Sequence, residues 1–380
     1  MTGKILSPNP YEPKPPRGIA KREPTYNGCR VRVTDHAADG IKGFTRNDYS
    51  RRQPFNADST LQLVYASGGA WHLYDSNYQH VVELPGIVSG DAEPQWHHSD
   101  PNTLYFLPDS GVGMKVYSLD VTTKKSTVVG DLGSRLISLW PTAKAAWTRS
   151  EGSPSADNRY WCLQVESGTK ILGMITWDLQ TDSILGYLNL TKRPDHVSMT
   201  PSGDYCIVQA GGTTAYSRYL NASKVISNTG EHSDIGIDAN GDDTFVSVDY
   251  NGDGSVFMVN VRTGVNTKLF TVYNHGTTTS THFSCKAFNR PGWFVFGTHN
   301  ENPVGSKEWL FHQVQVVQMA ANPKIYHIAN NHVFYNGYWT EPHAAPNREL
   351  TRIVWNSNWD INTDMDVDVY MVELPDGAIH

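Results

Sequence analysis

The sequence predicts an all-β fold, a single seven-bladed β-propeller of four-stranded antiparallel blades. Two observations of composition and pattern point to strands. Charged residues make up only 18% of the 380 residues, below the ~25% usual in soluble domains, whereas Gly, Thr, Ser and aromatic residues are frequent. No stretch shows a sustained apolar period of 3.6 residues, so helices should be few. The third observation is a strand-and-turn unit that recurs at roughly 40–60-residue spacing, which is typical of propeller blades.

The chain begins with a segment unlike the rest. Residues 1–25 are rich in proline and basic residues and show no periodicity, which predicts an extended N-terminal arm. The propeller then occupies residues 26–380. We expect the segment YNGCRVRVTD at 26–35 to add a strand to the last blade, whose other strands lie in 343–375, because such a strand removes the open seam of the ring. A pair of β-sandwiches is the structural alternative.

Each recurring unit has a polar or turn-forming start, a short apolar strand and turns such as TPSGD and DANGD. The unit starts are Gln53, Gln95, Trp140, His196, His232, His282 and His343. The unit near Trp140 is less regular than the others. Because the first strand of each blade lines the central channel, residues at its beginning should surround one mouth of that channel.

Four of the seven unit starts are histidines: His196, His232, His282 and His343. A lone histidine of this kind is more often a hydrogen-bonded structural residue. Four at equivalent positions favour a functional mouth, since convergent titratable groups in a pocket are typical of active and binding sites. We expect at least three of them to share a pocket.

The cysteines and the charge narrow the class of protein. Cys29, Cys162, Cys206 and Cys285 are far apart without a CxxC spacing, which predicts buried small hydrophobic residues rather than disulfides or a zinc site. The net charge of −7 argues against nucleic-acid binding.

Two oxygen-rich segments, 249–254 and 360–368, depart from the EF-hand pattern and are interpreted as turns between strands.

No apolar run is long enough to span a membrane, and the first residues lack the apolar core of a signal peptide. We therefore expect a monomer that binds neither membrane nor nucleic acid. Export by another route or residence in a virus particle stays open. The expected place of action is extracellular or on a virion, or cytoplasmic if the substrate is an imported oligosaccharide.

Three segments near the C-terminus resemble those of a known family. They are HSDIGIDANGDD, THFSCKAFNRPGWFVFGTHN and EPHAAPNRELTRIVWNSNW, and in this order they are similar to the propeller polysaccharide lyases, among them oligogalacturonate lyase and the ulvan lyases. The resemblance implies cleavage of a uronate-containing glycan by β-elimination at the channel mouth. In that family His, Tyr and Arg side chains act there, in some members with a divalent metal.

The resemblance also implies a metal site. In oligogalacturonate lyase the motif of the last blade supplies a Gln and two closely spaced His to Mn²⁺. Here His343 retains one of these positions, while Glu341 and Tyr338 stand where the other ligands are expected, and His282 resembles the ligand of the preceding blade. A site made of His282, Glu341 and His343 is chemically acceptable for one divalent ion, Mn²⁺ or Ca²⁺.

The predicted function is therefore a polysaccharide lyase that acts on an acidic poly- or oligosaccharide. Elimination requires a cation near the uronate carboxylate, a base for the C5 proton and an acid for the departing oxygen. The catalytic candidates are His232, His282, His343, His196 and the proton donor Tyr338. The substrate-binding candidates are Arg52, Gln53, Gln95, Trp96, Arg193, Arg290 and Trp339.

Two other functions remain open. The alternative is a non-catalytic propeller that binds a glycan or a protein, which explains the fold and the aromatic residues but assigns no role to the histidines. A glycoside hydrolase would use two carboxylates across one sugar, whereas histidines predominate at the unit starts.

Overall fold

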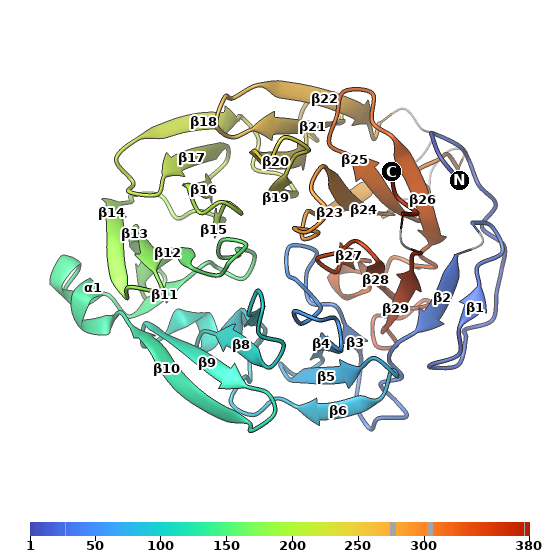
Figure 1. Cartoon of the computed structure of the whole chain (residues 1–380), viewed down its shortest axis with the longest axis horizontal. Helices are drawn as coiled ribbons and strands as arrows, with labels where there is room; N and C mark the ends of the chain where they lie inside the picture. The colour runs from blue at the N-terminus through green and yellow to red at the C-terminus, as the bar shows by residue number, and fades with distance from the viewer. Residues whose placement is uncertain (27, 274–278, 302–306, 376) are drawn as a thin grey trace.

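The computed structural model describes residues 1–26, 28–273, 279–301, 307–375 and 377–380. Seven antiparallel sheets stand in a ring, with strands such as β15 (His196–Met199) toward its centre and strands such as β18 (Ser223–Ser227) at its rim (Figure 1). The chain passes around the ring once, and each sheet uses strands consecutive in sequence except the last. The predicted seven-bladed propeller is therefore confirmed.

We number the blades I to VII in chain order, each written from the inner strand outward. Blade I has β3 (Thr45–Arg46), β4 (Leu61–Ala66), β5 (Trp71–Asp75) and β6 (His80–Glu83). Blade II has β7 (Gln95–Trp96), β8 (Thr103–Phe106), β9 (Lys115–Asp120) and β10 (Lys125–Asp131). Blade III has β11 (Ala145–Trp147), β12 (Tyr160–Ser167), β13 (Lys170–Asp178) and β14 (Ser183–Asn189). Blade IV has β15 (His196–Met199), β16 (Tyr205–Gln209), β17 (Thr213–Ser217) and β18 (Ser223–Ser227).

Blade V has β19 (Ser233–Ile237), β20 (Asp243–Val248), β21 (Ser255–Asn260) and β22 (Asn266–Thr271). Blade VI has β23 (Ser280–Ser284), β24 (Trp293–His299), β25 (Gln313–Gln318) and β26 (Ile325–Asn330). Blade VII has β27 (Ala345–Pro346), β28 (Arg352–Ser357) and β29 (Asp368–Glu373), followed by β2 (Cys29–Arg32) and β1 (Lys21–Arg22). The helical elements are α1 (Gly133–Leu139) and the 3₁₀ turns η1 (Gly90–Ala92), η2 (Asp109–Gly111) and η3 (Tyr338–Thr340).

Blade VII closes the ring with both ends of the chain. Strand β2 pairs antiparallel with β29 from Cys29 opposite Glu373 to Arg32 opposite Tyr370. This confirms the predicted N-terminal strand. The residues before β2 also contact this part of the ring. Thr2 forms a β-bridge with Tyr326 of blade VI, and Arg17 forms one with Arg32 of β2.

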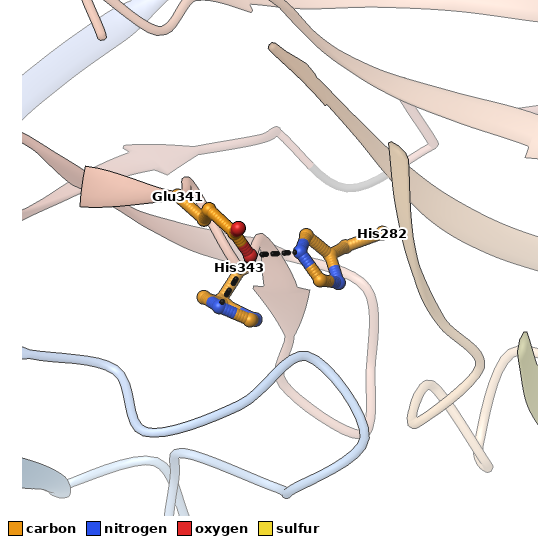
Figure 2. Close-up of side chains that lie close together, drawn as sticks. All are labelled: His282, Glu341 and His343. Carbon is orange, nitrogen blue, oxygen red and sulfur yellow. Dashed lines mark hydrogen bonds and ion pairs between the residues drawn. The ribbon is translucent and has the colours of Figure 1, made fainter. Parts of the chain in front are cut away.

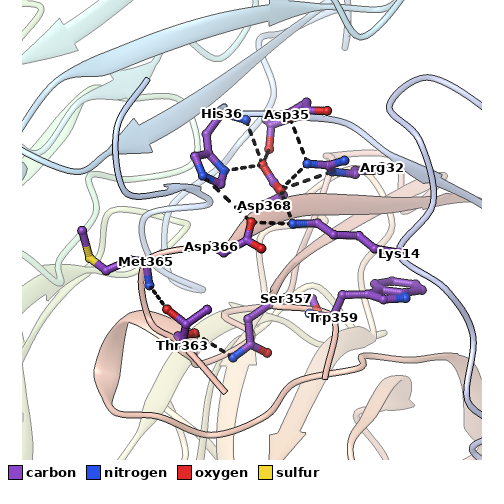
Figure 3. Close-up of polar contacts among 12 residues, drawn as sticks. Lys14, Arg32, Asp35, His36, Ser357, Trp359, Thr363, Met365, Asp366 and Asp368 are labelled. Carbon is purple, nitrogen blue, oxygen red and sulfur yellow. Dashed lines mark hydrogen bonds and ion pairs between the residues drawn. The ribbon is translucent and has the colours of Figure 1, made fainter. Parts of the chain in front are cut away.

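A buried carboxylate ties these segments together (Figure 3). Asp368, the first residue of β29, has a fully buried side chain that accepts from Arg32 Nη2 at 2.7 Å and lies 3.0 Å from Lys14 Nζ. Lys14 also reaches Asp366 at 2.6 Å, and His36 Nδ1 lies 3.1 Å from Asp368. Opposite charges buried together therefore connect the N-terminal segment to the last blade.

Seven clusters of buried apolar residues fill the seven interfaces between neighbouring blades. For example, Trp161 and Trp177 of blade III pack against Val116 of blade II. Similarly, Phe270 of blade V contacts Phe296 of blade VI with ring centroids 5.6 Å apart. Each sheet thus buries both faces against other blades, which is how a ring of small sheets acquires a continuous core.

Two predicted blade starts are corrected. The inner strand of blade I begins at Thr45 rather than Gln53. This strand pairs with β4 only at Thr45–Arg46. The chain then leaves the sheet and contacts it again at the β-bridge between Phe55 and Gln62, so residues 47–54 form a loop. The inner strand of blade III begins at Ala145, because the residues before Trp140 form α1 and the Trp140 N–H closes its last turn on the Leu136 carbonyl.

The cysteine prediction is wrong for three of the four residues. Cys162 of β12 and Cys206 of β16 form a disulfide between blades III and IV, with their Cα atoms 5.7 Å apart. Their 44-residue separation hid the pairing, because each residue lies near the beginning of the second strand of its blade and only the contact between adjacent blades brings them together. Cys285 is buried and unpaired, as predicted, but Cys29 is exposed.

The two oxygen-rich segments connect strands. Residues 249–254 turn between β20 and β21, where the N–H groups of Gly252 and Gly254 donate to the Asp249 carbonyl. Residues 360–368 lead from β28 to β29 and contain the two carboxylates that pair with Lys14. No helix within the described ranges is long and apolar enough to cross a membrane.

Candidate functional site

Three histidines and a glutamate from three blades meet near the axis: His232, His282, His343 and Glu341. Figure 2 shows His282, Glu341 and His343. His282 lies in the middle of β23, and its Nε2 donates to Glu341 Oε2 at 2.7 Å. His343 Nε2 lies 3.4 Å from the same oxygen. The His282 ring also lies 4.0 Å from the His343 ring and 4.5 Å from the His232 ring, centroid to centroid. Three of the four predicted histidines thus share one cluster.

A close approach of backbone segments builds this cluster. His282 pairs across the sheet with Gly297 of β24. A Cβ atom at position 297 would stand only 3.2 Å from the Ala344 Cβ and 3.6 Å from Pro342. The glycine therefore lets the segment that carries Glu341 and His343 lie against blade VI.

Burial shifts the pKa values of the residues in the cluster. Both His282 and His343 are almost fully buried. Burial lowers the pKa of His282 well below its usual value, and the neighbouring imidazoles His343 and His232 lower it further. Burial followed by the Arg46 charge does the same to the pKa of His343. Burial alone would raise the pKa of Glu341, but its hydrogen bond with His282 and the charges of nearby histidines outweigh this and lower it.

The donor atoms of the cluster suit a divalent metal ion, whose binding would replace the hydrogen bond between His282 and Glu341. Ligand atoms of His282, Glu341 and His343 all lie within 4.8 Å of one another. Neither ring nitrogen of His343 has a hydrogen-bond partner among the described residues, although the ring is completely buried. Neutral imidazoles with a carboxylate are the donors that first-row divalent metals prefer. Such a buried, unpaired imidazole is consistent with a ligand that is absent from the structure.

His232 presents a free nitrogen beside this cluster. It precedes β19 and is only partly buried. Its Nδ1 lies 2.6 Å from the Thr281 carbonyl oxygen. Because a carbonyl only accepts, the proton of the neutral ring stays on Nδ1 and Nε2 keeps its lone pair. This is the tautomer that a general base requires.

The loop at 47–54 supplies neighbours that the sequence did not indicate. The Tyr49 ring lies 4.6 Å from the ring of His343 and 5.5 Å from that of His282. Arg51 stands 5.5 Å from the Tyr49 ring and donates to His196 Nε2 at 2.5 Å. The excursion of the first inner strand therefore carries an aromatic ring and a cation to the axis.

Arg46 lies behind the cluster. It is fully buried, and none of its three guanidinium nitrogens has a hydrogen-bond partner among the described residues. Its guanidinium carbon lies 5.1 Å from the Tyr338 ring and 5.2 Å from the Trp339 ring. Arg46 thus places an uncompensated positive charge beside His343 and under the aromatic pair.

A pocket of about 370 Å³ opens next to the histidines. Its walls are aromatic rings, carboxylates and small polar groups, namely Asp48, Tyr49, Tyr65, Ser89, Gly90, Asp91, Ser150, Glu151, Tyr338 and Trp339. The Tyr338 ring lies 5.5 Å from the His343 ring, and Phe44 stacks on the Trp339 ring at 4.9 Å. Two predicted site residues, Tyr338 and Trp339, therefore join the cluster to a cavity large enough for a small ligand.

His196 belongs to a separate group. At the start of β15 its Nδ1 lies 3.2 Å from Asp195 and 3.6 Å from Glu151. Burial and then the charge of Arg51 lower the pKa of His196. Arg51 and Tyr49 stand between this group and His282, so His196 is near the axis without contact to the other three histidines.

Four further candidates make internal contacts. Arg52 donates to Asp48 Oδ2 at 2.6 Å and to the carbonyls of Pro94 and Ser150. Gln53 donates to the Lys286 carbonyl, and Gln95 to the Gly152 carbonyl. Trp96 is 2% exposed within the core between blades I and II. The structure places these side chains in the scaffold around the mouth rather than on the pocket wall.

The last two arginine candidates lie outside the cluster. Arg193 forms two hydrogen bonds with Glu166, at 2.7 and 3.0 Å. Arg290 donates to the carbonyl of Ile379 near the C-terminus, beyond the far end of β23. Among the described residues, neither arginine contacts the histidine cluster.

Sequence reasoning missed Arg46, Tyr49, Arg51, His299 and Glu301. One signal was available for the first three, because the segment TRNDYSRRQ gathers four charged side chains and a tyrosine in a chain otherwise poor in charge. The misplaced start of blade I, at Gln53, hid it. For His299 and Glu301, which lie at the end of a strand and just after it, the sequence carried no comparable signal.

Comparisons with known proteins bear on the fold. No protein-family model and no curated protein matches the sequence. The structure is similar to an oligogalacturonate lyase from Vibrio parahaemolyticus, with a TM-score of 0.66 and 11% identity over 95% of this chain and 97% of that one. It is also similar to an oligogalacturonate lyase in complex with manganese, with a TM-score of 0.65 and 12% identity over 100% of this chain and 98% of that one.

A third similar structure is hydrazine synthase from Kuenenia stuttgartiensis, with a TM-score of 0.53 and 12% identity over 85% of this chain and 96% of that one. Since that name denotes another activity, the fold by itself does not determine the reaction. The chain has the seven-bladed propeller architecture of the oligogalacturonate lyases, and the resemblance noted in its sequence is confirmed at the level of the fold.

Proposed function

We propose that this protein is a polysaccharide lyase that cleaves an acidic, uronate-containing glycan by β-elimination. One observation carries the proposal: His232, with an unprotonated Nε2, stacks on a buried His282–Glu341–His343 cluster whose neighbouring pocket has aromatic walls. The likeness to oligogalacturonate lyases supports the same reaction class.

His232 is the proposed base. Nε2 takes the C5 proton of the uronate, while the Nδ1 hydrogen bond to the Thr281 carbonyl stabilises the imidazolium that forms. The electron pair left at C5 forms the C4–C5 double bond as the C4–oxygen bond breaks. The product is an unsaturated uronate end and a new hydroxyl end.

Tyr338 is the proposed acid. The Tyr338 residue is 47% exposed at the pocket, so a substrate can reach it. Burial of the hydroxyl end raises its pKa, although the nearby Arg46 opposes the shift, so the group stays protonated and can donate to the departing glycosidic oxygen. Tyr338 lines the pocket and contacts His343, as a donor at the scissile bond requires. Tyr49, on the same wall, holds the rings of His282 and His343 in place.

The uronate carboxylate needs positive charge beside it, because the C5 proton becomes acidic only when the adjacent carboxylate is neutralised. A divalent ion held by His282, Glu341 and His343 would supply that charge as a Lewis acid. Arg46 adds a permanent positive charge behind His343.

The disulfide between Cys162 and Cys206 supports a location. Disulfides persist in oxidising surroundings, so we propose that the protein acts outside the cell or on a virus particle. A non-catalytic glycan-binding role would need the aromatic pocket but not the tautomer of His232 or the buried imidazoles.

Absorbance assays on a panel of uronate polysaccharides test the proposal. Purified protein is incubated with each glycan, and ultraviolet absorbance and reducing ends are both followed. A lyase raises both, whereas a hydrolase releases reducing ends alone. Binding without either product on every uronate glycan would support the non-catalytic role and reject the proposal.

A further inference from the structure

A second group of metal-binding side chains adjoins the first and shares Glu341 with it. His299, Glu301 and Glu341 bring their ligand atoms within 4.8 Å of one another. His299 ends β24, and Glu301 follows two residues later in the chain. The reaction described above uses neither residue.

His299 has no hydrogen-bond partner that would explain its burial. Its side chain is 0% exposed, and neither ring nitrogen is paired among the described residues. A buried imidazole without partners loses the hydrogen bonds it made with water, which costs ~1–3 kcal/mol. A metal ion at Nε2 would offset that cost.

The spacing of the two carboxylates around His299 fits an ion better than hydrogen bonds. Nε2 lies 3.8 Å from Glu301 Oε1 and 4.0 Å from Glu341 Oε1, too far for a hydrogen bond in either case. Ligand bonds to first-row metals are about 2.0–2.2 Å long, so two donors on one ion stand about 3–4 Å apart. The observed gaps lie in that range.

The neighbours of His299 and Glu301 hold these donors in place. Ser280 Oγ donates to Glu301 Oε1 at 2.7 Å. The rings of Tyr335 and His282 lie nearly parallel to the His299 ring, with centroids 5.3 and 6.0 Å away. Such outer contacts fix a ligand before the ion arrives.

Glu341 faces the two groups with different oxygens. Oε2 contacts His282 and His343, whereas Oε1 faces His299. No Lys or Arg of the described residues forms an ion pair with Glu341 or Glu301. Histidines are therefore the only basic groups of the described residues that pair with these two carboxylates, which leaves room for the positive charge of a metal ion.

We propose that Glu341 bridges two divalent metal ions, one held with His282 and His343 and the other with His299 and Glu301. A carboxylate that binds one ion through each oxygen is a natural link in paired metal sites, where the ions stand about 3.5–4 Å apart. Nitrogen and oxygen donors in this mixture suit Mn²⁺ or Zn²⁺.

Metal content tests the proposal without reference to catalysis. The protein is stripped with chelator, loaded separately with Mn²⁺ and Zn²⁺, freed of excess ion and measured by elemental analysis and titration calorimetry. We expect two ions per chain for the unmodified protein and one for Glu301→Gln. His299→Ala should also bind one ion, and Glu341→Gln fewer than either single-site variant.

Glu301→Gln keeps the test interpretable, because this side chain is 41% exposed and its replacement should not disturb folding. His36→Ala is the matched control. It changes the third group, His36 with Asp366 and Asp368, whose carboxylates Lys14 and Arg32 already neutralise. We expect this variant to keep two ions.

One ion or none in the unmodified protein, or two in Glu301→Gln, would overturn the proposal. Electron paramagnetic resonance of the Mn²⁺ form tests the bridge itself: a magnetically coupled pair is expected, and two isolated Mn²⁺ signals would contradict it. Since no substrate is present, failure of the lyase assay leaves these outcomes unaffected.

Discussion

The Nδ1 atom of His232 lies 2.6 Å from the carbonyl oxygen of Thr281, and this contact assigns the tautomer of the ring. Thr281 belongs to the inner strand of blade VI, whereas His232 precedes that of blade V. A neighbouring blade therefore orients the proposed base and leaves its Nε2 free.

The first prediction follows from this contact. His232→Ala should slow the formation of unsaturated uronate about 10²–10⁴-fold, the usual loss when a general base is removed. Initial rates by ultraviolet absorbance measure it, with circular dichroism to verify the fold. His98→Ala, which removes an exposed histidine of blade II, should keep the full rate. Equal rates in the two variants would show that another group takes the proton.

Removal of metal is the second prediction. Prolonged treatment with EDTA should abolish lyase activity, because the buried imidazoles of His282 and His343 then face Glu341 without the cation that neutralises the substrate. Added Mn²⁺ should restore activity. Full activity in a sample that elemental analysis shows to be free of metal would assign the neutralising role to Arg46 instead.

The third prediction concerns the aromatic wall. Trp339→Ala should raise KM about tenfold and change kcat much less, because this ring lines the pocket but does not contact the histidines. Trp339→Phe should recover most of the affinity. Steady-state kinetics on one oligosaccharide of defined length measure both constants, and a fall in kcat alone would contradict a binding role.

The fourth prediction is a pH dependence of stability. Burial alone would raise the pKa of Asp368, but the hydrogen bond from His36 and the charges of Lys14 and Arg32 outweigh it and hold the pKa well below its usual value. Its stabilisation is therefore complete above about pH 4 and is lost as the pH falls toward the lowered pKa. Denaturant unfolding from pH 7 to pH 2 measures the loss.

Asp368→Asn should lower the free energy of unfolding by about 3 kcal/mol at neutral pH, because it removes the buried partner of Arg32 and leaves that guanidinium only the more exposed carboxylate of Asp35. The variant should also show a weaker acid dependence than the unmodified protein. Asp131→Asn is the matched control. Its carboxylate is 57% exposed and 3.6 Å from Lys115, so the change should stay below about 1 kcal/mol.

The fifth prediction tests the link between blades III and IV. The double variant Cys162→Ala and Cys206→Ala should lower the free energy of unfolding by about 2–4 kcal/mol, since the disulfide closes a loop across 44 residues. Calorimetry gives the shift in Tm. Cys29→Ala, at an exposed and unpaired position, should leave Tm unchanged. A double variant as stable as the control would show that the bond contributes nothing.

The architecture was predictable from sequence because its causes are local. Alternating apolar residues and Asp, Asn or Gly turns specify each hairpin, and their sevenfold recurrence specifies the ring. The same regularity explains why His232, His282 and His343 could be expected to meet, since the beginnings of inner strands face one axis. Their exact positions differ from the prediction, because His232 and His343 precede their strands whereas His282 lies in the middle of β23. His196 shows the limit of this argument, because Arg51 stands between it and the others.

The chemistry around that axis was decided by the tertiary structure. Glu341 was predicted as a ligand, but its two oxygens face different histidines only because Gly297 lets the segment at 342–344 lie against blade VI. Tyr49 and Arg51 reach the cluster because the first inner strand leaves its sheet, which no periodicity reveals. The composition, period and turns of the sequence by themselves determined the hairpins and, through their recurrence, the ring, since these depend on neighbours along the chain. The closing strand β2 pairs with β29 at the other end of the chain, and it was predictable only because an open ring would leave an unpaired edge. The partners of each buried charge and of Cys162 depend on contacts between blades, and such contacts exist only after the ring has closed.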